Sequence, residues 1–152
     1  MKAFTFRLET VLSLRAGEEK IAQENYARAL QHVSRAEQEL ADAQADLERL
    51  HMALESNRGG RFTKNDQLIS LNAIKYQQSI CERDAERLEH AKQEAEHRLA
   101  DLIDAKRAHE ILLRLKSKQQ SAHAREADCR EQTAIDDMVT ARHGAGQREV
   151  AA

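Results

Sequence analysis

The sequence predicts an all-α protein: a long antiparallel two-helix coiled-coil hairpin with an overhanging C-terminal helix. Its 152 residues include no proline and only five glycines, two of which are adjacent, at Gly59 and Gly60. Charged side chains make up 33% of the chain and aromatic ones 3%, which is typical of long helices and leaves too few bulky residues for a round core. On both sides of the glycine pair, apolar residues recur at alternating steps of three and four, the pattern of a coiled coil.

The first helix is expected over residues 4–57. Its seam, the face that would pack on the second helix, consists of two sets of residues spaced seven apart. The large set is Leu12, Glu19, Tyr26, Val33, Leu40, Leu47 and Leu54, and the small set is Leu8, Arg15, Ala22, Ala29, Ala36, Ala43 and Leu50. Alanine is the best helix former, and its small side chain lets two backbones approach closely. We therefore expect the second helix to pack close to the first.

The chain is expected to reverse over residues 58–63, because glycine adopts positive φ angles without a Cβ clash. Thr63 and Asp66 have the spacing of a capping box with Asp in place of Glu, so the second helix is expected over residues 64–142. Its seam is predicted as one set with Ile74, Cys81, Leu88, Ala95, Leu102 and His109, and another with Leu71, Gln78, Ala85, Lys92, Leu99, Lys106 and Leu113.

The second helix is expected to outrun the first. A reversal near residue 60 places residue i near residue 120 minus i, so Phe6 would lie near Arg114. From Lys116 to Ala134 the sequence keeps helix-forming residues but has no apolar stripe. About 25 residues, or about 40 Å, would overhang as a single helix, and such a helix is marginal in water without a partner. Gly144 and Gly146 are expected to end it, with a flexible tail over residues 143–152.

Composition argues against several classes of protein. The formal net charge is −2, so no overall field favours nucleic acid or an anionic membrane. No stretch approaches the roughly 20 apolar residues of a membrane span, and Arg7, Glu9 and Arg15 interrupt any signal-peptide core. Cys81 and Cys129 would lie about 70 Å apart on one helix, too far to form a disulfide. These features predict a cytoplasmic protein with reduced cysteines.

No catalytic, cofactor-binding or metal site is expected. No pair of the seven histidines has the i, i+4 spacing of a helical metal site, and the chain has neither a Cys-x-x-Cys motif nor a glycine-rich phosphate loop. A pair of helices offers no pocket that would desolvate a carboxylate. We therefore expect a protein that is not an enzyme.

The N-terminus has more apolar surface than one seam needs. This surface comes from Phe4, Phe6, Leu8, Val11, Leu12 and Leu14. Two interpretations stay open: these residues attach the first helix to the second, or they form an exposed anchor for a partner. Charge also varies along the chain, with acidic residues over 37–55 and basic residues over 106–125. The basic end is either a solvated helix face or a surface that docks onto an acidic protein.

Residues 4–15, FTFRLETVLSLR, and residues 131–142, EQTAIDDMVTAR, form two end motifs that resemble those of the flagellar FliJ family. Its members typically begin with F-x-F-x-L-E-x-V-L-x-L-R, and residues 4–15 here are FTFRLETVLSLR. The family also tends to end with E-Q-x-x-L-D-E-x-x-x-x-R. Residues 131–142 match this pattern with Ile135 and Asp137 in place of Leu and Glu. The resemblance spans the whole hairpin layout, but its specificity lies in these two end motifs.

The resemblance implies a stalk or adaptor of the flagellar type III export apparatus, cytoplasmic and peripheral to the inner membrane at the flagellar base. Such a protein would bind the hexameric export ATPase, promote its assembly, and reach the cytoplasmic domain of the export gate, with export chaperones as further partners. It would associate with the membrane only through these partners. The residues carried over as candidate ATPase contacts are Phe4, Phe6, Leu8, Glu9, Val11, Leu12, Arg15, Gln132, Ile135, Asp136, Asp137 and Arg142.

Other interpretations remain open at this point. The chain could be the analogous stalk protein of a virulence-type injectisome, or a cytoplasmic coiled-coil adaptor or chaperone unrelated to secretion. A coiled-coil arm that binds nucleic acid is disfavoured, because the basic end is weakly charged and has no aromatic stacking surface. The glycine turn and the matched seams favour a monomeric hairpin.

Overall fold

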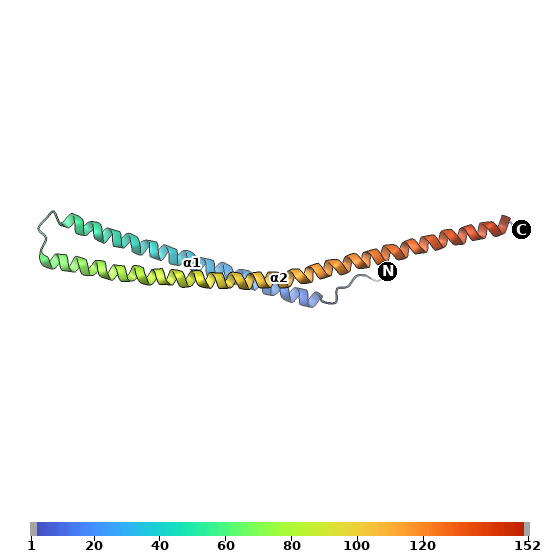
Figure 1. Cartoon of the computed structure of the whole chain (residues 1–152), viewed down its shortest axis with the longest axis horizontal. Helices are drawn as coiled ribbons and strands as arrows, with labels where there is room; N and C mark the ends of the chain where they lie inside the picture. The colour runs from blue at the N-terminus through green and yellow to red at the C-terminus, as the bar shows by residue number, and fades with distance from the viewer. Residues whose placement is uncertain (1–2, 151–152) are drawn as a thin grey trace. The chain divides into compact units, whose positions relative to one another are not determined.

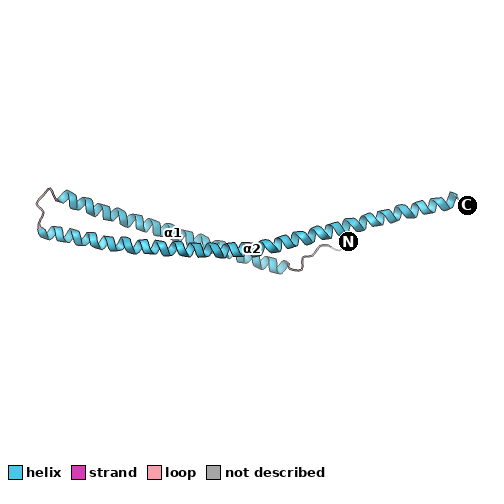
Figure 2. Cartoon of the chain, in the orientation of Figure 1, coloured by secondary structure: helices cyan, strands magenta, loops and turns pink. Residues whose placement is uncertain are grey.

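A computed structural model describes residues 3–150, with side chains described up to residue 143. The chain forms two helices, α1 (Glu9–Asn57) and α2 (Lys64–Val150), which run antiparallel (Figure 1). The described residues contain no strand (Figure 2). This confirms the predicted all-α hairpin. Neither helix, within its described residues, has a stretch long and apolar enough to cross a membrane.

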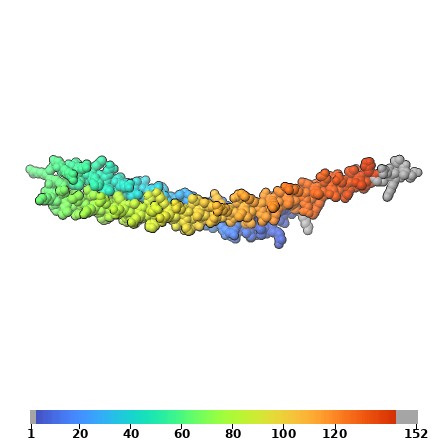
Figure 3. Space-filling view, in the orientation of Figure 1, coloured from blue at the N-terminus to red at the C-terminus, as the bar shows by residue number. Residues whose placement is uncertain are grey.

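The contacts of the chain form two compact units. The hairpin unit is Glu18–Ala105, which contains the turn, and the terminal unit is Met1–Gly17 together with Lys106–Ala152. Each unit therefore holds one stretch of α1 and one stretch of α2. Within the hairpin unit these two stretches lie side by side in the space-filling view (Figure 3).

In the hairpin unit, α1 meets α2 with the predicted face. Ala29, Ala36, Ala43 and Leu54 are buried, and the other members of the two predicted sets in this unit are half-buried. The side-chain amide of Gln77 on α2 donates a 2.9 Å hydrogen bond to the backbone oxygen of Ala43. Gln77 is the residue that a reversal near residue 60 places opposite Ala43, so the predicted register is correct here.

The seam of α2 matches the prediction in one of its two sets. Ile74, Ala95 and Leu102 are buried as predicted, and the remaining members of that set are half-buried. The prediction of the other set, which began at Leu71, is wrong, because those residues are exposed. The half-buried or buried residues are instead one position earlier: Ser70, Gln77, Asp84, Ala91, Arg98, Ala105 and Leu112.

A one-residue shift turns a helix face by about 100°, and its cause lies in the chemistry of this second set. The prediction favoured the face that carries Leu71 and Leu99, which are 41% and 37% exposed. The face that packs on the alanines of α1 instead carries small and polar side chains. Polar side chains are compatible with burial when they find hydrogen-bond partners, as Gln77 does at the backbone of Ala43.

Asp84 is the buried charged residue of this seam, with 6% of its surface exposed. Its Oδ1 accepts hydrogen bonds from Nε and Nη2 of Arg83, at 3.1 and 3.0 Å. Nη1 of Arg87 lies 3.6 Å from the same oxygen. The burial of this carboxylate is therefore compensated by two arginines of its own helix rather than by α1.

The turn is closed by the predicted capping box. The backbone N–H of Thr63 donates to Oδ2 of Asp66 at 3.1 Å, and the N–H of Asp66 donates to Oγ1 of Thr63 at 3.2 Å. Donation by the Thr63 hydroxyl, and then by its N–H, lowers the pKa of Asp66 below its ordinary value. Neither Gly59 nor Gly60 has a positive φ. The expectation that the turn needs the left-handed region is therefore wrong.

Two helix ends differ from the predicted ranges 4–57 and 64–142. α1 begins at Glu9, because aromatic and β-branched residues such as Phe4, Thr5 and Phe6 are weak helix formers and this segment packs on α2 instead. α2 continues through Gly144 and Gly146 to Val150. A glycine in a helix costs about 1 kcal/mol relative to alanine, which does not by itself end a helix. Of the tail expected over 143–152, residues 151 and 152 lie outside the described residues.

Candidate functional site

All the residues carried over from the family resemblance fall in the terminal unit. They form an N-terminal set between Phe4 and Arg15 and a C-terminal set between Gln132 and Arg142. The first set lies at the start of α1 and in the segment before it, and the second lies in the last third of α2.

The N-terminal aromatic residues attach the segment before α1 to α2. The ring centroids of Phe4 and His123 are 5.7 Å apart and the rings are tilted by 58°, a favourable geometry for aromatic pairs. Phe6 is 8% exposed, and Nζ of Lys116 lies 6.0 Å from its ring centroid, at the limit of a cation–π contact. Of the two interpretations of the N-terminal apolar surface, attachment to α2 is therefore correct for these two phenylalanines.

Lys116 also binds Glu9, the first residue of α1. Its Nζ lies 2.8 Å from Oε2 and 2.9 Å from Oε1 of Glu9. The Glu9 carboxylate also stands in the first turn of α1, where the helix dipole favours negative charge. One lysine of α2 therefore contacts both Glu9 and Phe6 and helps to fix where α1 begins.

Sequence reasoning missed Lys116 and His123, the α2 partners of this segment. The predicted register placed Phe6 near Arg114, two residues from Lys116. The positive charge of Lys116 and the negative charge of Glu9 were therefore a signal that could have identified this pair. The partner of Phe4 is further off because the segment before Glu9 is not helical. An extended chain advances about 3.3 Å per residue instead of 1.5 Å, so Phe4 reaches further along α2 than the helical register allows.

The rest of the N-terminal motif divides into two faces. Leu12 is 6% exposed and belongs to the seam, while Leu8, Val11 and Leu14 are 38%, 39% and 60% exposed. Arg15 is also exposed. The outer face keeps apolar side chains in reach of a partner, so the interpretation as an exposed anchor survives for Leu8, Val11 and Leu14 only.

The C-terminal set lies on a stretch of α2 in which every described side chain from residue 128 to residue 143 is exposed. Ile135, Met138 and Val139 are 49%, 60% and 55% exposed. Their i, i+3, i+4 spacing puts them on one side of the helix. We call these three residues the distal stripe. Sequence reasoning named Ile135 but missed Met138 and Val139, which follow it at helical spacing.

The two sets of motif residues do not form one continuous surface. The N-terminal segment reaches α2 at His123, and Ile135 lies twelve residues, or about 18 Å, further along the helix. Figure 1 shows α2 continuing well beyond the N-terminal segment. The distal stripe is thus a separate surface on a single helix, as expected for the overhang.

The exposed apolar residues of the terminal unit have the arrangement of a protein-binding surface. Among the described residues, no group of three or more His, Cys, Asp or Glu side chains could hold a metal ion. Exposed apolar side chains at i, i+3 and i+4 are the usual anchors by which a helix docks onto a partner protein. The terminal unit offers such anchors at the distal stripe and on the outer face of α1.

Comparison with known proteins points to one family. A family model described as "Flagellar FliJ protein" matches residues 4–148. This match includes both end motifs and nearly the whole chain. No curated protein and no solved structure shows significant similarity to the chain.

Proposed function

Since the chain belongs to the flagellar FliJ family, whose members are associated with flagellar protein export, we propose that it is a non-enzymatic stalk of the export apparatus. In this role it binds the hexameric export ATPase and promotes its assembly. The observation that carries the proposal is the distal stripe, an apolar row on a stretch of α2 where all described side chains are exposed.

A single helix with such a row gains stability from a partner. Polar helices without tertiary packing are marginal in water, and burial of apolar side chains on binding contributes about 25 cal/mol per Å². Asp136 and Asp137 stand next to the stripe and are exposed, so they are available to orient the helix on a basic partner surface. The ATPase would therefore cover the stripe, with Gln132 and Arg142 at its margins.

The outer face of α1 is the second part of this proposed contact. Leu8 and Val11 are little more than a third exposed, whereas Phe4, Phe6 and Leu12 are engaged with α2 or buried. We assign Leu8, Val11 and Leu14 to the ATPase and give the other apolar members of the motif a supporting role, which is to hold α1 on α2.

The same proposal includes a link to the cytoplasmic domain of the export gate. Because the terminal unit is assigned to the ATPase, the gate would contact the hairpin unit, and export chaperones would be further partners. The protein would then work in the cytoplasm at the flagellar base and reach the membrane only through these partners, as a monomer.

Co-purification with the export ATPase of the same organism tests the proposal. Met138→Asp should abolish capture of the ATPase, because it places a charge in the middle of the stripe. Met52→Asp is the matched control, since Met52 is 61% exposed in the hairpin unit and Met138 is 60% exposed. Capture that survives Met138→Asp and Ile135→Asp would discard the stripe as the contact. Absence of capture by the unmodified chain would discard the proposed function.

A further inference from the structure

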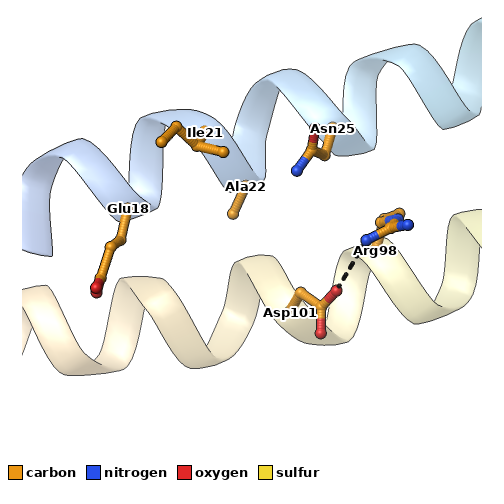
Figure 4. A pocket seen from close by; sticks show the side chains of 6 residues that line it. All are labelled: Glu18, Ile21, Ala22, Asn25, Arg98 and Asp101. Atoms are coloured by element: carbon orange, nitrogen blue, oxygen red, sulfur yellow. Dashed lines mark ion pairs between the residues drawn. The ribbon is translucent and has the colours of Figure 1, made fainter.

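The groove between α1 and α2 in the hairpin unit is too small for a cofactor (Figure 4). Its volume is about 170 Å³, whereas small-molecule sites usually have volumes of about 300–1,000 Å³. The charged side chains of Arg98 and Asp101 in it form an ion pair with each other. The contacts around the turn before α1, in the terminal unit, carry more information about function.

A turn over residues 6–9 carries Leu8, one of the residues that the proposed function assigns to the ATPase. The backbone N–H of Glu9 donates a 3.2 Å hydrogen bond to the backbone oxygen of Phe6, which closes this turn. The backbone oxygen of Leu8 accepts a 2.9 Å hydrogen bond from the N–H of Leu12 at the start of α1. The position of Leu8 therefore depends on how this turn is held.

Lys116 of α2 contacts both ends of this turn. Its Nζ lies 2.8 and 2.9 Å from the two carboxylate oxygens of Glu9, the last residue of the turn. The same atom lies 6.0 Å from the ring centroid of Phe6, the first residue. Leu8 lies between these two residues in the sequence and is 38% exposed. One side chain of α2 thus holds the turn at both ends while Leu8 stays accessible to a partner.

The ion pair gives Glu9 a role within the chain. The N-terminal motif makes Glu9 a candidate ATPase contact, but its carboxylate is bound by Lys116, 107 residues later in the chain. The side chain of Lys116 is 32% exposed and that of Glu9 is 55% exposed. Because the pair is partly shielded from water, salt screens it less than a fully exposed pair. The ATPase would have to compete with Lys116 for this carboxylate.

The segment before α1 depends on such contacts because it is not helical. The first residues of a chain are poorly ordered unless contacts tie them down. A surface that is ordered before binding loses less conformational entropy when a partner binds, so it binds more tightly. A contact that orders the turn can therefore contribute to affinity without touching the partner.

We propose that Lys116 is a positioning residue of the ATPase contact, although it lies outside both end motifs. It acts through Glu9 and Phe6, which hold the turn so that Leu8 is presented in one orientation. Glu9 serves as the partner of Lys116 within the chain and does not contact the ATPase. This inference rests on the proposed function, since it takes the ATPase as the partner of Leu8.

Biolayer interferometry of the full-length protein with the export ATPase of the same organism tests this inference. Lys116→Met keeps the length of the side chain, removes its charge and should raise the dissociation constant about three- to fivefold, as expected for a partly exposed ion pair. Lys116→Arg keeps the charge and should recover most of this loss. Lys118→Met is the matched control, since Lys118 is an exposed lysine of the same helix, and should change the constant by less than about twofold.

A charge exchange separates a role within the chain from a direct contact with the ATPase. Lys116→Glu alone places two carboxylates opposite each other and should weaken binding more than Lys116→Met does. Adding Glu9→Lys restores an ion pair of reversed polarity and should strengthen binding at least about twofold relative to Lys116→Glu alone. A direct contact of Glu9 with the ATPase predicts the opposite, because the second substitution would then remove a negative charge that the ATPase binds.

A small loss of overall stability would not imitate these results, because a chain that stays folded keeps its dissociation constant, and circular dichroism checks that each variant is folded. Equal binding by Lys116→Met and Lys118→Met would overturn the inference and leave the proposed function intact. So would a double variant that binds more weakly than Lys116→Glu alone. If the unmodified chain does not bind the ATPase, the proposed function and the inference fail together.

Discussion

The side-chain amide of Gln77 on α2 donates a hydrogen bond to the backbone oxygen of Ala43 on α1, 34 residues earlier in the chain. A helix with ordinary side chains is about 10–12 Å wide, so a side chain reaches the backbone of a neighbouring helix only where the facing residues are small. The contact is therefore a direct sign of the close packing that Ala29, Ala36 and Ala43 allow.

Enlarging one of these alanines should destabilise the hairpin. Ala36→Leu inserts three carbon atoms into a closely packed seam and should lower the free energy of unfolding by about 1–3 kcal/mol. Ala41→Leu is the matched control, because Ala41 is exposed on the same helix. Urea unfolding followed by circular dichroism gives both values. Equal stability of the two variants would mean that the seam does not pack at Ala36.

Removing the buried carboxylate of Asp84 should instead stabilise the hairpin. Asp84→Ala eliminates a desolvated charge and adds a better helix former, so the free energy of unfolding should rise by about 1 kcal/mol. Arg83→Ala leaves that charge with one arginine fewer and should lower stability, by less than about 1 kcal/mol because the arginine is more than half exposed. A loss of stability in Asp84→Ala would show that the aspartate itself stabilises the seam.

The capping box makes the start of α2 sensitive to acid. The folded-state pKa of Asp66 is lowered by Thr63, so the contribution of this carboxylate is complete above the unfolded pKa of about 3.9. It is lost as the pH falls from there through the folded pKa. Thr63→Ala should raise the pKa of Asp66 toward its ordinary value, measured by NMR titration of the carboxyl group. An unchanged pKa would mean that the hydroxyl of Thr63 does not act on Asp66.

The attachment of the segment before α1 to α2 should depend on Phe6. Phe6→Ala removes a ring that is 8% exposed and should lower the free energy of unfolding of the terminal unit by about 2 kcal/mol. Leu8→Ala, at a position that is 38% exposed, should change it by less than half as much. Hydrogen exchange of the amides in the first turns of α1 measures this local stability. Similar exchange in both variants would mean that the ring does not hold the helix.

The single glycine inside α1 should be replaceable. A Cβ built at Gly17 meets no atom within 4 Å, and no described glycine has a positive φ. Gly17→Ala should therefore raise the free energy of unfolding by about 0.5–1 kcal/mol, seen as a higher midpoint of thermal unfolding. A lower midpoint would show that the glycine relieves a strain in α1.

The sequence predicted the features that depend on local spacing along the chain. Three features follow from local sequence: the alanine row of α1 (Ala29, Ala36 and Ala43), the position of the turn, and the capping box formed by Thr63 and Asp66. Each of them depends on spacing within one helix or one turn. The second row of α2 could not be predicted in this way. Asp84 lies in the seam with its charge compensated by Arg83 and Arg87, whereas a count of apolar residues favours the face of Leu71 and Leu99 instead.

The candidate site was likewise predicted only in part. The end motifs identified the residues of the terminal unit, but not which of them face α2. Phe4 and Phe6 are engaged because His123 and Lys116 stand opposite them, and Glu9, the first residue of α1, forms an ion pair with that same lysine. These are single contacts between residues more than 100 positions apart, which no repeat in the sequence encodes.

The alanine row has a consequence for entropy. A buried alanine loses no side-chain rotamer freedom on folding, while longer side chains lose up to about 2 kcal/mol of it. Each of these alanines therefore gains little free energy from burial and loses little conformational entropy, so its net contribution is small and much the same from one alanine to the next. Stability then accumulates with the number of turns, as in repeat proteins. The length of α1, 49 residues, therefore determines how much stability the helix pair accumulates.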